Sequence, residues 1–371
     1  MWSFGYLIYA FAFDGCNVYA ATWGGKIYKS TDSGVSWVVF SESLDAYIWS
    51  LTVVQGRIFA ATVKGVYVYS GGKWVLAGCA NLDVHDLAFH NGVIYAATWS
   101  SGVYMSVDFG VTWKQINNGF NTWPVIQAIT VCGSGDVYAA TFGFGIYRLQ
   151  SGSTTWVQLN CSFQMFWAIA ASKTALFAAS YGDGLYKSVN GTSWTKVTTL
   201  PVQFIYAIDV SPQCGKIYVS SLTGGVYMSS DDGLTWTHLG FTGSNVCALA
   251  VDPSTDEVLV GTKTGEVYKI PAGLTGGEIK DQVPQDFILS QNYPNPFNPV
   301  TTIEFAVPEA GEYTLKVYDM LGREAATLLK GSLTTGYHKA AFDAGGLPSG
   351  VYIYRLTGNN VVLSKKMMVV K

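Results

Sequence analysis

The sequence predicts an all-β protein: a seven-bladed β-propeller in residues 1–270, a linker in residues 271–285 and an immunoglobulin-like β-sandwich in residues 286–371. The main observation is a four-residue motif, typified by Tyr95-Ala96-Ala97-Thr98, that occurs seven times. Its copies end at Thr22, Thr62, Thr98, Thr141, Ser180, Ser221 and Thr262, which are 36 to 43 residues apart. A period of this length, filled with short alternating strands, is typical of propeller blades.

Composition divides the chain once, near Pro271. All 12 Trp and all 6 Cys lie before this point, and the seven repeats end there. Charged residues make up only 13% of the chain and Gly is abundant, which favours strands joined by tight turns over helices. The segment 286–371 alternates apolar and polar residues in six or seven short runs, which predicts a small sandwich.

Each repeat is interpreted as four strands, which in the third repeat cover residues 84–89, 93–98, 102–106 and 112–116. The first strand is predicted to line the central channel, and the paired Ala residues of the second strand allow neighbouring blades to approach.

The seventh repeat has no fourth strand of its own after Ile270, so we expect residues 1–4 to complete it and remove the open edge. Because this closing strand is short, we also expect the natural sequence to begin further upstream.

A turn with the pattern SxDxGxTW, an Asp-box, joins the third and fourth strands at residues 30–37, where Ser36 replaces the Thr, and at residues 106–113 and 229–236. The carboxylate can accept backbone N–H bonds within its own turn, the Gly can take a positive φ, and the Trp can pack between blades. We therefore assign a structural role to these residues: Asp32, Gly34, Trp37, Asp108, Gly110, Trp113, Asp231, Gly233 and Trp236.

Several classes of function are not supported. A net charge of -3 without a dense Lys/Arg cluster argues against nucleic acid, and no apolar run is long enough to span a membrane. The 4 His and 6 Cys show no metal-ligand spacing, so no metal and no cofactor is expected. The cysteines are predicted to be free and mostly buried. The protein is expected to be a monomer.

The C-terminal segment carries specific motifs: NYPNPFNP at 292–299, VYD at 317–319, LGR at 321–323, the stretch 347–354 and KKM at 365–367. In these it resembles the type A C-terminal sorting domain of the type IX secretion system. The resemblance implies a secreted or surface-displayed protein of a Gram-negative bacterium, with the secretion machinery as a partner through residues 286–371. Such proteins also carry an N-terminal signal peptide, which is a second reason to expect an upstream segment. The alternative is a sandwich without an export role.

The repeats resemble the sialidase/BNR-repeat superfamily, which includes glycosidase propellers and photosystem II assembly factors. A sialidase needs three arginines on the sugar carboxylate, and the propeller has only Arg57 and Arg148. Sialidase activity is therefore not expected.

One face of the predicted propeller is rich in aromatic residues, which suit a glycan or a protein ligand. The proposed ligand-binding residues follow strand two or begin strand one: Trp23, Trp49, His85, Trp99, Phe142, Trp167 and Tyr181. Further rings on this side are Tyr47, Trp123, Phe144, Phe166, Phe204 and Tyr206.

Two other interpretations remain open. A glycoside hydrolase would need two carboxylates, for which Asp86 and Asp183 are the candidates, although they form no recognisable pair. In a purely structural or protein-interaction propeller, the rings would seal the blade tops against one another. The residues favour a binding protein over an enzyme.

Overall fold

The computed structural model describes residues 2–120, 124–160, 165–222, 224–272, 287–292, 294–333, 336–359 and 361–370. Every regular element in these residues is a strand, which confirms the predicted all-β class. The chain divides into two compact units, residues 2–277 and 278–371. Most of the predicted linker, residues 273–285, lies outside the described residues.

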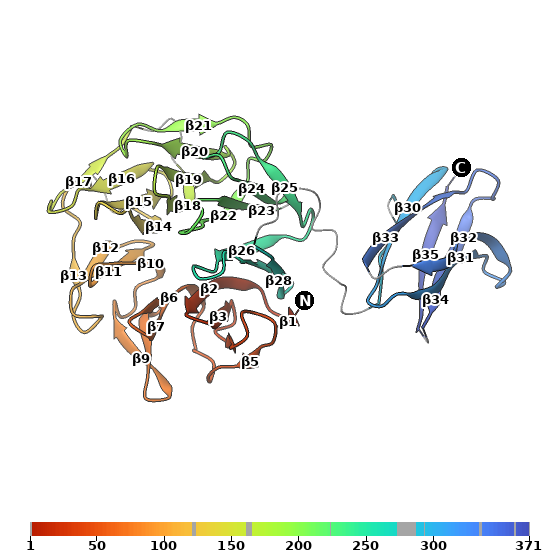
Figure 1. The fold of residues 1–371 in the computed structure, drawn as a ribbon, viewed down its shortest axis with the longest axis horizontal. Helices are drawn as coiled ribbons and strands as arrows, with labels where there is room; N and C mark the ends of the chain where they lie inside the picture. Colours follow the sequence, from red (N-terminus) through yellow and green to blue (C-terminus); the bar gives the residue numbers. More distant parts are fainter. Residues whose placement is uncertain are drawn as a thin grey trace. The chain divides into compact units, whose positions relative to one another are not determined.

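The described part of the N-terminal unit contains seven four-stranded antiparallel sheets, one for each repeat of the sequence. Figure 1 shows them arranged around a centre, with the first strand of each sheet innermost. We number these blades 1 to 7 in chain order of their first strands.

Blade 1 comprises β2 (Ile8–Asp14), β3 (Asn17–Thr22), β4 (Ile27–Ser30) and β5 (Val38–Val39). Blade 2 comprises β6 (Ile48–Val54), β7 (Arg57–Thr62), β8 (Gly65–Ser70) and β9 (Lys73–Gly78). Blade 3 comprises β10 (Val84–His90), β11 (Val93–Thr98), β12 (Gly102–Ser106) and β13 (Lys114–Gln115). Blades 4 and 5 comprise β14 (Ile126–Val131), β15 (Val137–Thr141), β16 (Ile146–Leu149) and β17 (Trp156–Gln158); β18 (Phe166–Ala171), β19 (Leu176–Ser180), β20 (Leu185–Ser188) and β21 (Thr195–Val197). Blade 6 comprises β22 (Ile205–Val210), β23 (Ile217–Ser221), β24 (Gly225–Ser229) and β25 (Thr237–Gly240), and blade 7 comprises β26 (Val246–Val251), β27 (Val258–Thr262), β28 (Glu266–Ile270) and β1 (Trp2–Ser3).

Blade 7 is completed by the N-terminal strand, as the sequence predicted. Trp2 pairs with Val267 and Ser3 pairs with Glu266 in an antiparallel register. Phe4 continues the contact, because its N–H donates to the Gly265 carbonyl at 2.8 Å. This pairing covers the edge of β28 that the chain would otherwise leave open.

The repeated motif of the second strand has two packing roles. Its paired small residues are fully buried, as at Ala96 and Ala97, where the sheets of neighbouring blades meet. Its last residue closes the following turn through its hydroxyl. Thr98 Oγ1, for example, donates to the Gly102 carbonyl at 2.7 Å, and Thr141 Oγ1 donates to the Gly145 carbonyl at 2.7 Å.

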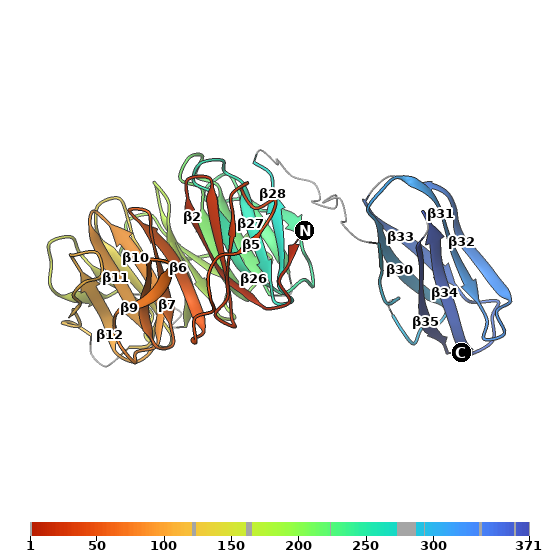
Figure 2. The same ribbon diagram turned by 90° about the horizontal axis from the view of Figure 1, so that it is seen from below.

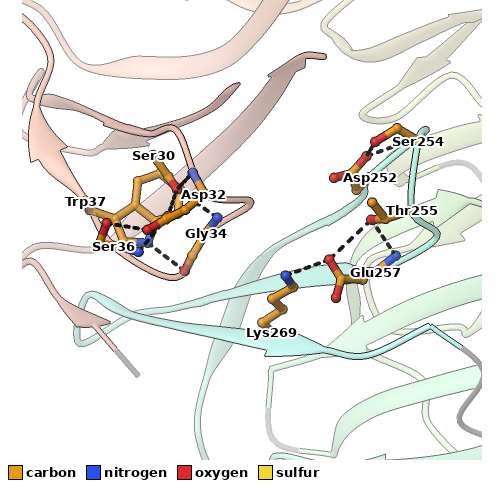
Figure 3. A network of polar contacts seen from close by, with 10 residues as sticks. All are labelled: Ser30, Asp32, Gly34, Ser36, Trp37, Asp252, Ser254, Thr255, Glu257 and Lys269. Atoms are coloured by element: carbon orange, nitrogen blue, oxygen red, sulfur yellow. Dashed lines mark hydrogen bonds and ion pairs between the residues drawn. The ribbon is translucent and has the colours of Figure 1, made fainter. Parts of the chain in front are cut away.

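The three SxDxGxTW turns share one hydrogen-bond pattern. In the second turn, Asp108 accepts bonds from the Thr112 N–H at 2.8 Å, the Thr112 hydroxyl at 2.5 Å and the Ser106 hydroxyl at 2.8 Å. These bonds lower the pKa of the Asp108 carboxyl to about 2. Figure 3 shows the same arrangement around Asp32, where the Trp37 indole N–H also donates to the Gly34 carbonyl at 3.1 Å.

Each of these turns docks against the blade that precedes it in the ring. Gly110 has a φ of 86°, and a Cβ built on it would lie 2.8 Å from Cε1 of Phe59 in blade 2. The equivalent Cβ on Gly34 would lie 3.0 Å from Leu259 of blade 7. Glycine is therefore required at Gly110 both by the backbone conformation and by the close approach of the preceding blade.

The C-terminal unit has two antiparallel sheets that share one core. The first consists of β29 (Ile288–Leu289), β30 (Val300–Val307) and β33 (Gly336–Asp343); the second consists of β32 (Glu324–Leu333), β31 (Gly311–Tyr318), β34 (Gly350–Gly358) and β35 (Val361–Val369). Figure 2 shows β30 and β33 on one side of this unit and β31, β32 and β34 on the other. Period-2 alternation places Ile303 and Phe305 of β30 and Leu315 and Val317 of β31 in the shared core.

Five cysteines lie in the described residues, and all five are free. Cys79 and Cys247 are buried, whereas Cys132 is half-buried and Cys16 and Cys214 are exposed. The prediction that the thiols are mostly buried is therefore wrong for the described residues, because these last three lie in the turns between the first and second strands of their blades. Cys161 lies outside the described residues. No helix in the described part of the chain is long and apolar enough to cross a membrane.

Candidate ligand-binding site

The first strand of every blade has a register irregularity at its second residue. In β10 the pairing with β11 shifts between Val84 and Asp86, so His85 has no partner in the ladder. The same shift occurs at the same position of β2, β6, β14, β18, β22 and β26. Because a bulge turns its extra residue out of the regular pleat, it can redirect a side chain from the blade packing towards the central channel.

The seven bulged residues form a ring that we call the bulge ring. Its members, from blade 1 to blade 7, are Tyr9, Trp49, His85, Gln127, Trp167, Tyr206 and Cys247. All seven line a cavity of about 210 Å³ in the channel, which we call the channel cavity. Three of them, Trp49, His85 and Trp167, are among the predicted ligand-binding residues.

A second and wider cavity of about 630 Å³, the mouth cavity, adjoins the channel cavity. The two share all members of the bulge ring except Cys247. The mouth cavity is lined in addition by Tyr6, Leu7, Trp23, Asp83, Trp99 and Lys263. Its volume lies within the range that is usual for small-molecule sites.

The predicted aromatic residues form a continuous series of ring contacts around the mouth. Trp49 stacks on His85 with ring centres 4.5 Å apart, and His85 stacks on Trp99 at 4.8 Å. Trp99 in turn lies 6.1 Å from Phe142. Exposure differs along the series, because Trp99 keeps 38% of its surface exposed while His85 keeps 7%.

The series continues on both sides. Phe142 lies 6.3 Å from Tyr181, and Tyr181 lies 5.6 Å from Trp167. On the other side, Trp23 meets Trp49 edge to face at 4.9 Å. All seven predicted ligand-binding residues therefore belong to one cluster, although Phe142 and Tyr181 do not line either cavity. Trp123 lies outside the described residues.

One carboxylate organises the polar part of the mouth. Asp83 accepts a hydrogen bond from the Trp49 indole N–H at 2.7 Å, and its other oxygen lies 3.4 Å from Nε2 of His85. Burial raises the pKa of the Asp83 carboxyl, but the His85 ring and the Trp49 N–H lower it more, so this pKa lies below its usual value. Asp83 thus holds two members of the bulge ring in place.

In the bulge ring, the buried Oε1 of Gln127 has no hydrogen-bond partner, whereas the buried Nε2 of His85 has the Asp83 carboxylate 3.4 Å away. Both side chains are 7% exposed, and both line the mouth cavity and the channel cavity. Buried polar groups are almost always paired with protein or water, because an unpaired group costs about 1–3 kcal/mol. Gln127 Oε1 is therefore available to a hydrogen-bond donor inside the channel.

Asp86 lines the channel cavity, but both of its carboxylate oxygens are occupied. One accepts the Leu87 N–H at 2.8 Å, and the other accepts the Ile129 N–H of blade 4 at 3.0 Å. Burial raises the pKa of this carboxyl to about 6, although these N–H groups partly offset the effect. The contacts join blade 3 to blade 4 and give Asp86 a structural role in the described structure.

Asp183 does not share a cavity with Asp86. Its carboxylate lies 2.5 Å from the Lys196 ammonium of β21 and accepts a hydrogen bond from the Tyr186 hydroxyl at 2.5 Å. These two groups lower the pKa of the Asp183 carboxyl. The two acids proposed for hydrolysis are therefore engaged in separate contacts.

Sequence reasoning did not select Tyr9, Asp83 or Lys263, all of which line the mouth cavity. Tyr9 could have been found, because it occupies the same repeat position as Trp49. Asp83 and Lys263 precede strand one and follow strand two of their blades, which are the positions that carry the predicted rings. In the described residues, no group of three or more His, Cys, Asp or Glu side chains could hold a metal ion.

The fold and the site define a β-propeller with an aromatic channel mouth, joined to a C-terminal β-sandwich. Residues 291–370 match the family described as "Secretion system C-terminal sorting domain". This match confirms the sorting domain that the motifs predicted. The chain therefore carries the C-terminal signal for export to the cell surface or out of the cell.

Solved structures with the same fold include three informative propellers. PorZ, a surface component of the type-IX secretion system of Porphyromonas gingivalis, is 16% identical with a TM-score of 0.54, and the match covers 97% of this chain and 59% of PorZ. YCF48 bound to D1 peptide is 16% identical with a TM-score of 0.59, covering 74% of this chain and 94% of YCF48. An ancestral GH74 enzyme is 16% identical with a TM-score of 0.64, covering 97% of this chain and 59% of the enzyme.

At this level of identity these likenesses show the fold alone. The chain spans 59% of the length of PorZ and of the GH74 enzyme. No curated protein matches the sequence.

Proposed function

We propose that this exported propeller is a binding protein for neutral glycans, which it holds at the mouth cavity. The observation that supports this most directly is that stacked aromatic rings and the unpartnered Gln127 oxygen line the same cavity. Sugar rings present apolar C–H faces and hydroxyl edges, which suit an aromatic wall with a few fixed polar groups. The cluster around His85 offers both an aromatic wall and fixed polar groups.

The contacts of the two candidate acids favour glycan binding without hydrolysis over a glycoside hydrolase. A glycosidase needs one carboxyl free to donate a proton and a second carboxylate facing the bond. Asp86 uses both oxygens to hold backbone N–H groups of blades 3 and 4, and Asp183 is paired with Lys196. Neither acid is free for catalysis in this arrangement.

Export is assigned to the type IX machinery acting through residues 286–371. Deletion of these residues should abolish export and leave the propeller folded inside the cell. Secretion of the truncated chain at the normal level would contradict this assignment.

The binding proposal is tested with the full chain on an array of neutral glycans that includes glucans, xylans, mannans and galactans. Trp99→Ala removes the most exposed tryptophan of the predicted site and should weaken binding about fivefold, since aromatic stacking contributes about 1 kcal/mol. The matched control is Phe89→Ala, because Phe89 lies on β10 with 36% exposure and lines neither cavity.

Three outcomes would change the assignment. Equal binding by Trp99→Ala and the wild-type chain would remove the site from the mouth. Peptide binding without glycan binding would replace the ligand class; YCF48, which shares the fold, is a propeller with a bound peptide. Release of reducing sugar that is lost in Asp86→Asn would make the protein a hydrolase.

A further inference from the structure

The channel cavity is enclosed by protein around its whole circumference. Its lining residues come from the first strands of all seven blades. Its lining also includes Phe11, Ile208 and Leu249. The cavity at the opposite end of the propeller, beside Val53 and Pro253, shares none of its residues. A ligand held in the mouth cavity can therefore reach the channel cavity only end first.

The two cavities differ in size, so they suit different parts of one ligand. The mouth cavity, at about 630 Å³, has room for an extended ligand, whereas the channel cavity, at about 210 Å³, is smaller than a usual small-molecule site. The channel cavity is suited to one terminal group of a longer molecule.

The polar atoms at the junction select the chemistry of that group. Gln127 Oε1 is an acceptor, so it requires a donor from the ligand. Nε2 of His85 lies 3.4 Å from the Asp83 carboxylate, so a proton on this nitrogen faces Asp83 and not the ligand. The free polar atom at the junction is therefore the Gln127 acceptor.

A hydroxyl can donate a hydrogen bond to Gln127 Oε1 and so meets this requirement. A carboxylate only accepts, so it would face Gln127 Oε1 without a proton between them. The walls of the channel cavity include the rings of Trp49 and Trp167, which suit the C–H face of a sugar.

We propose that the channel cavity is a terminal subsite, which takes the last sugar of a neutral glycan chain with one hydroxyl donating to Gln127 Oε1. This inference rests on the proposed glycan binding and adds to it that the protein recognises chain ends rather than chain interiors. An interior segment of a glycan has no free end to insert into the channel cavity, so it can contact only the mouth cavity.

The test compares the same neutral oligosaccharides immobilised in two orientations, with the linker at the reducing end or at the non-reducing end. The full chain should bind in one orientation only, and the orientation that binds identifies the end that enters. Equal binding in both orientations, or equal binding to circular glucans without ends, would overturn the proposal while leaving glycan binding intact.

A variant provides an independent measurement. Gln127→Met keeps the length of the side chain and removes the unpartnered oxygen, so binding should weaken about tenfold. Its thermal stability should not fall, because Oε1 makes no hydrogen bond that could be lost. The matched control is Thr130→Val, since Thr130 lies on the same strand and lines neither cavity.

The outcomes separate the two proposals. Unchanged affinity in Gln127→Met, with weaker binding in Trp99→Ala, would overturn the terminal subsite and keep the glycan site. Loss of binding in both variants, together with dependence on one chain end, supports the subsite. Absence of glycan binding by the wild-type chain would overturn both proposals.

Discussion

The docking of each SxDxGxTW turn against the preceding blade predicts unequal effects for the same substitution at two turns. Gly110→Ala and Gly233→Ala both place a Cβ on a glycine with positive φ, 86° and 83° respectively. This conformation costs a non-glycine residue about 1–2 kcal/mol in either turn. The surroundings of the new methyl group differ.

At Gly110 the new Cβ would lie 2.8 Å from Cε1 of Phe59, whose side chain is fully buried. At Gly233 the nearest atom is Cε1 of Phe177 at 3.5 Å, which is an ordinary contact. Overpacking of a filled core costs about 1–3 kcal/mol, so Gly110→Ala should be less stable than Gly233→Ala by about that amount.

Tryptophan fluorescence during thermal unfolding is a suitable assay, because all 12 Trp lie in residues 1–270 and none in the sorting domain. Gly233→Ala should lower the Tm by a few degrees, and Gly110→Ala should lower it further, at about 2–4 °C per kcal/mol. Adding Phe59→Leu to Gly110→Ala should recover part of the difference. An equal or larger loss in Gly233→Ala would refute the docking argument.

Two further predictions concern buried polar groups. Burial raises the pKa values of Asp86 and Asp209 to about 6, above the ordinary value of 3.8. The stability that these two protonated carboxyls contribute is fully present below pH 3.8 and is lost as the pH rises through 6. The free energy of unfolding should therefore be higher at pH 5 than at pH 7, by about 1 kcal/mol per carboxyl. When Tm is measured in steps from pH 7 to pH 5, Asp209→Asn should show a smaller rise in Tm than the wild-type chain. A wild-type Tm that falls steadily from pH 7 to pH 5 would contradict this prediction. In the C-terminal unit, Tyr354→Phe removes a hydroxyl that donates to the Ser290 carbonyl at 2.6 Å and accepts the Asn292 N–H at 3.0 Å. The loss should be about 1–3 kcal/mol in denaturant unfolding followed by far-UV circular dichroism, and an unchanged midpoint for the second unit would exclude a structural role for this bond pair.

Much of the fold could be predicted from the sequence because its determinants are local and repeated. The period of the Ala-Ala motif identified the second strand of every blade, and the missing fourth strand after Ile270 identified the closing role of the N-terminus. Both depend on residues that are close in sequence or equivalent between repeats. The motifs of the sorting domain, such as LGR at 321–323, are likewise contiguous.

The site could be predicted only in part, because it depends on register and on contacts between strands. The candidates Trp49 and Trp99 were found from their positions relative to the strands. The ion pair between Asp183 and Lys196 could not be predicted, because Asp183 lies in the turn between β19 and β20 and Lys196 lies on β21, and their contact depends on how these segments pack. The alignment of Gln127 with the channel depends on a bulge, which an alternating pattern does not reveal.

The bulge ring also bears on how this protein could change over time. At each of the seven positions the backbone has the same local geometry, yet the residues range from Trp49 through Gln127 to Cys247. The neighbouring apolar positions, such as Ile126 and Ile129, remain in the core. Because packing within a blade and exposure to the channel are assigned to different residues, substitutions in the ring alter the chemistry of the channel with little effect on folding. A propeller of this design can acquire a new ligand through single-residue steps, one blade at a time.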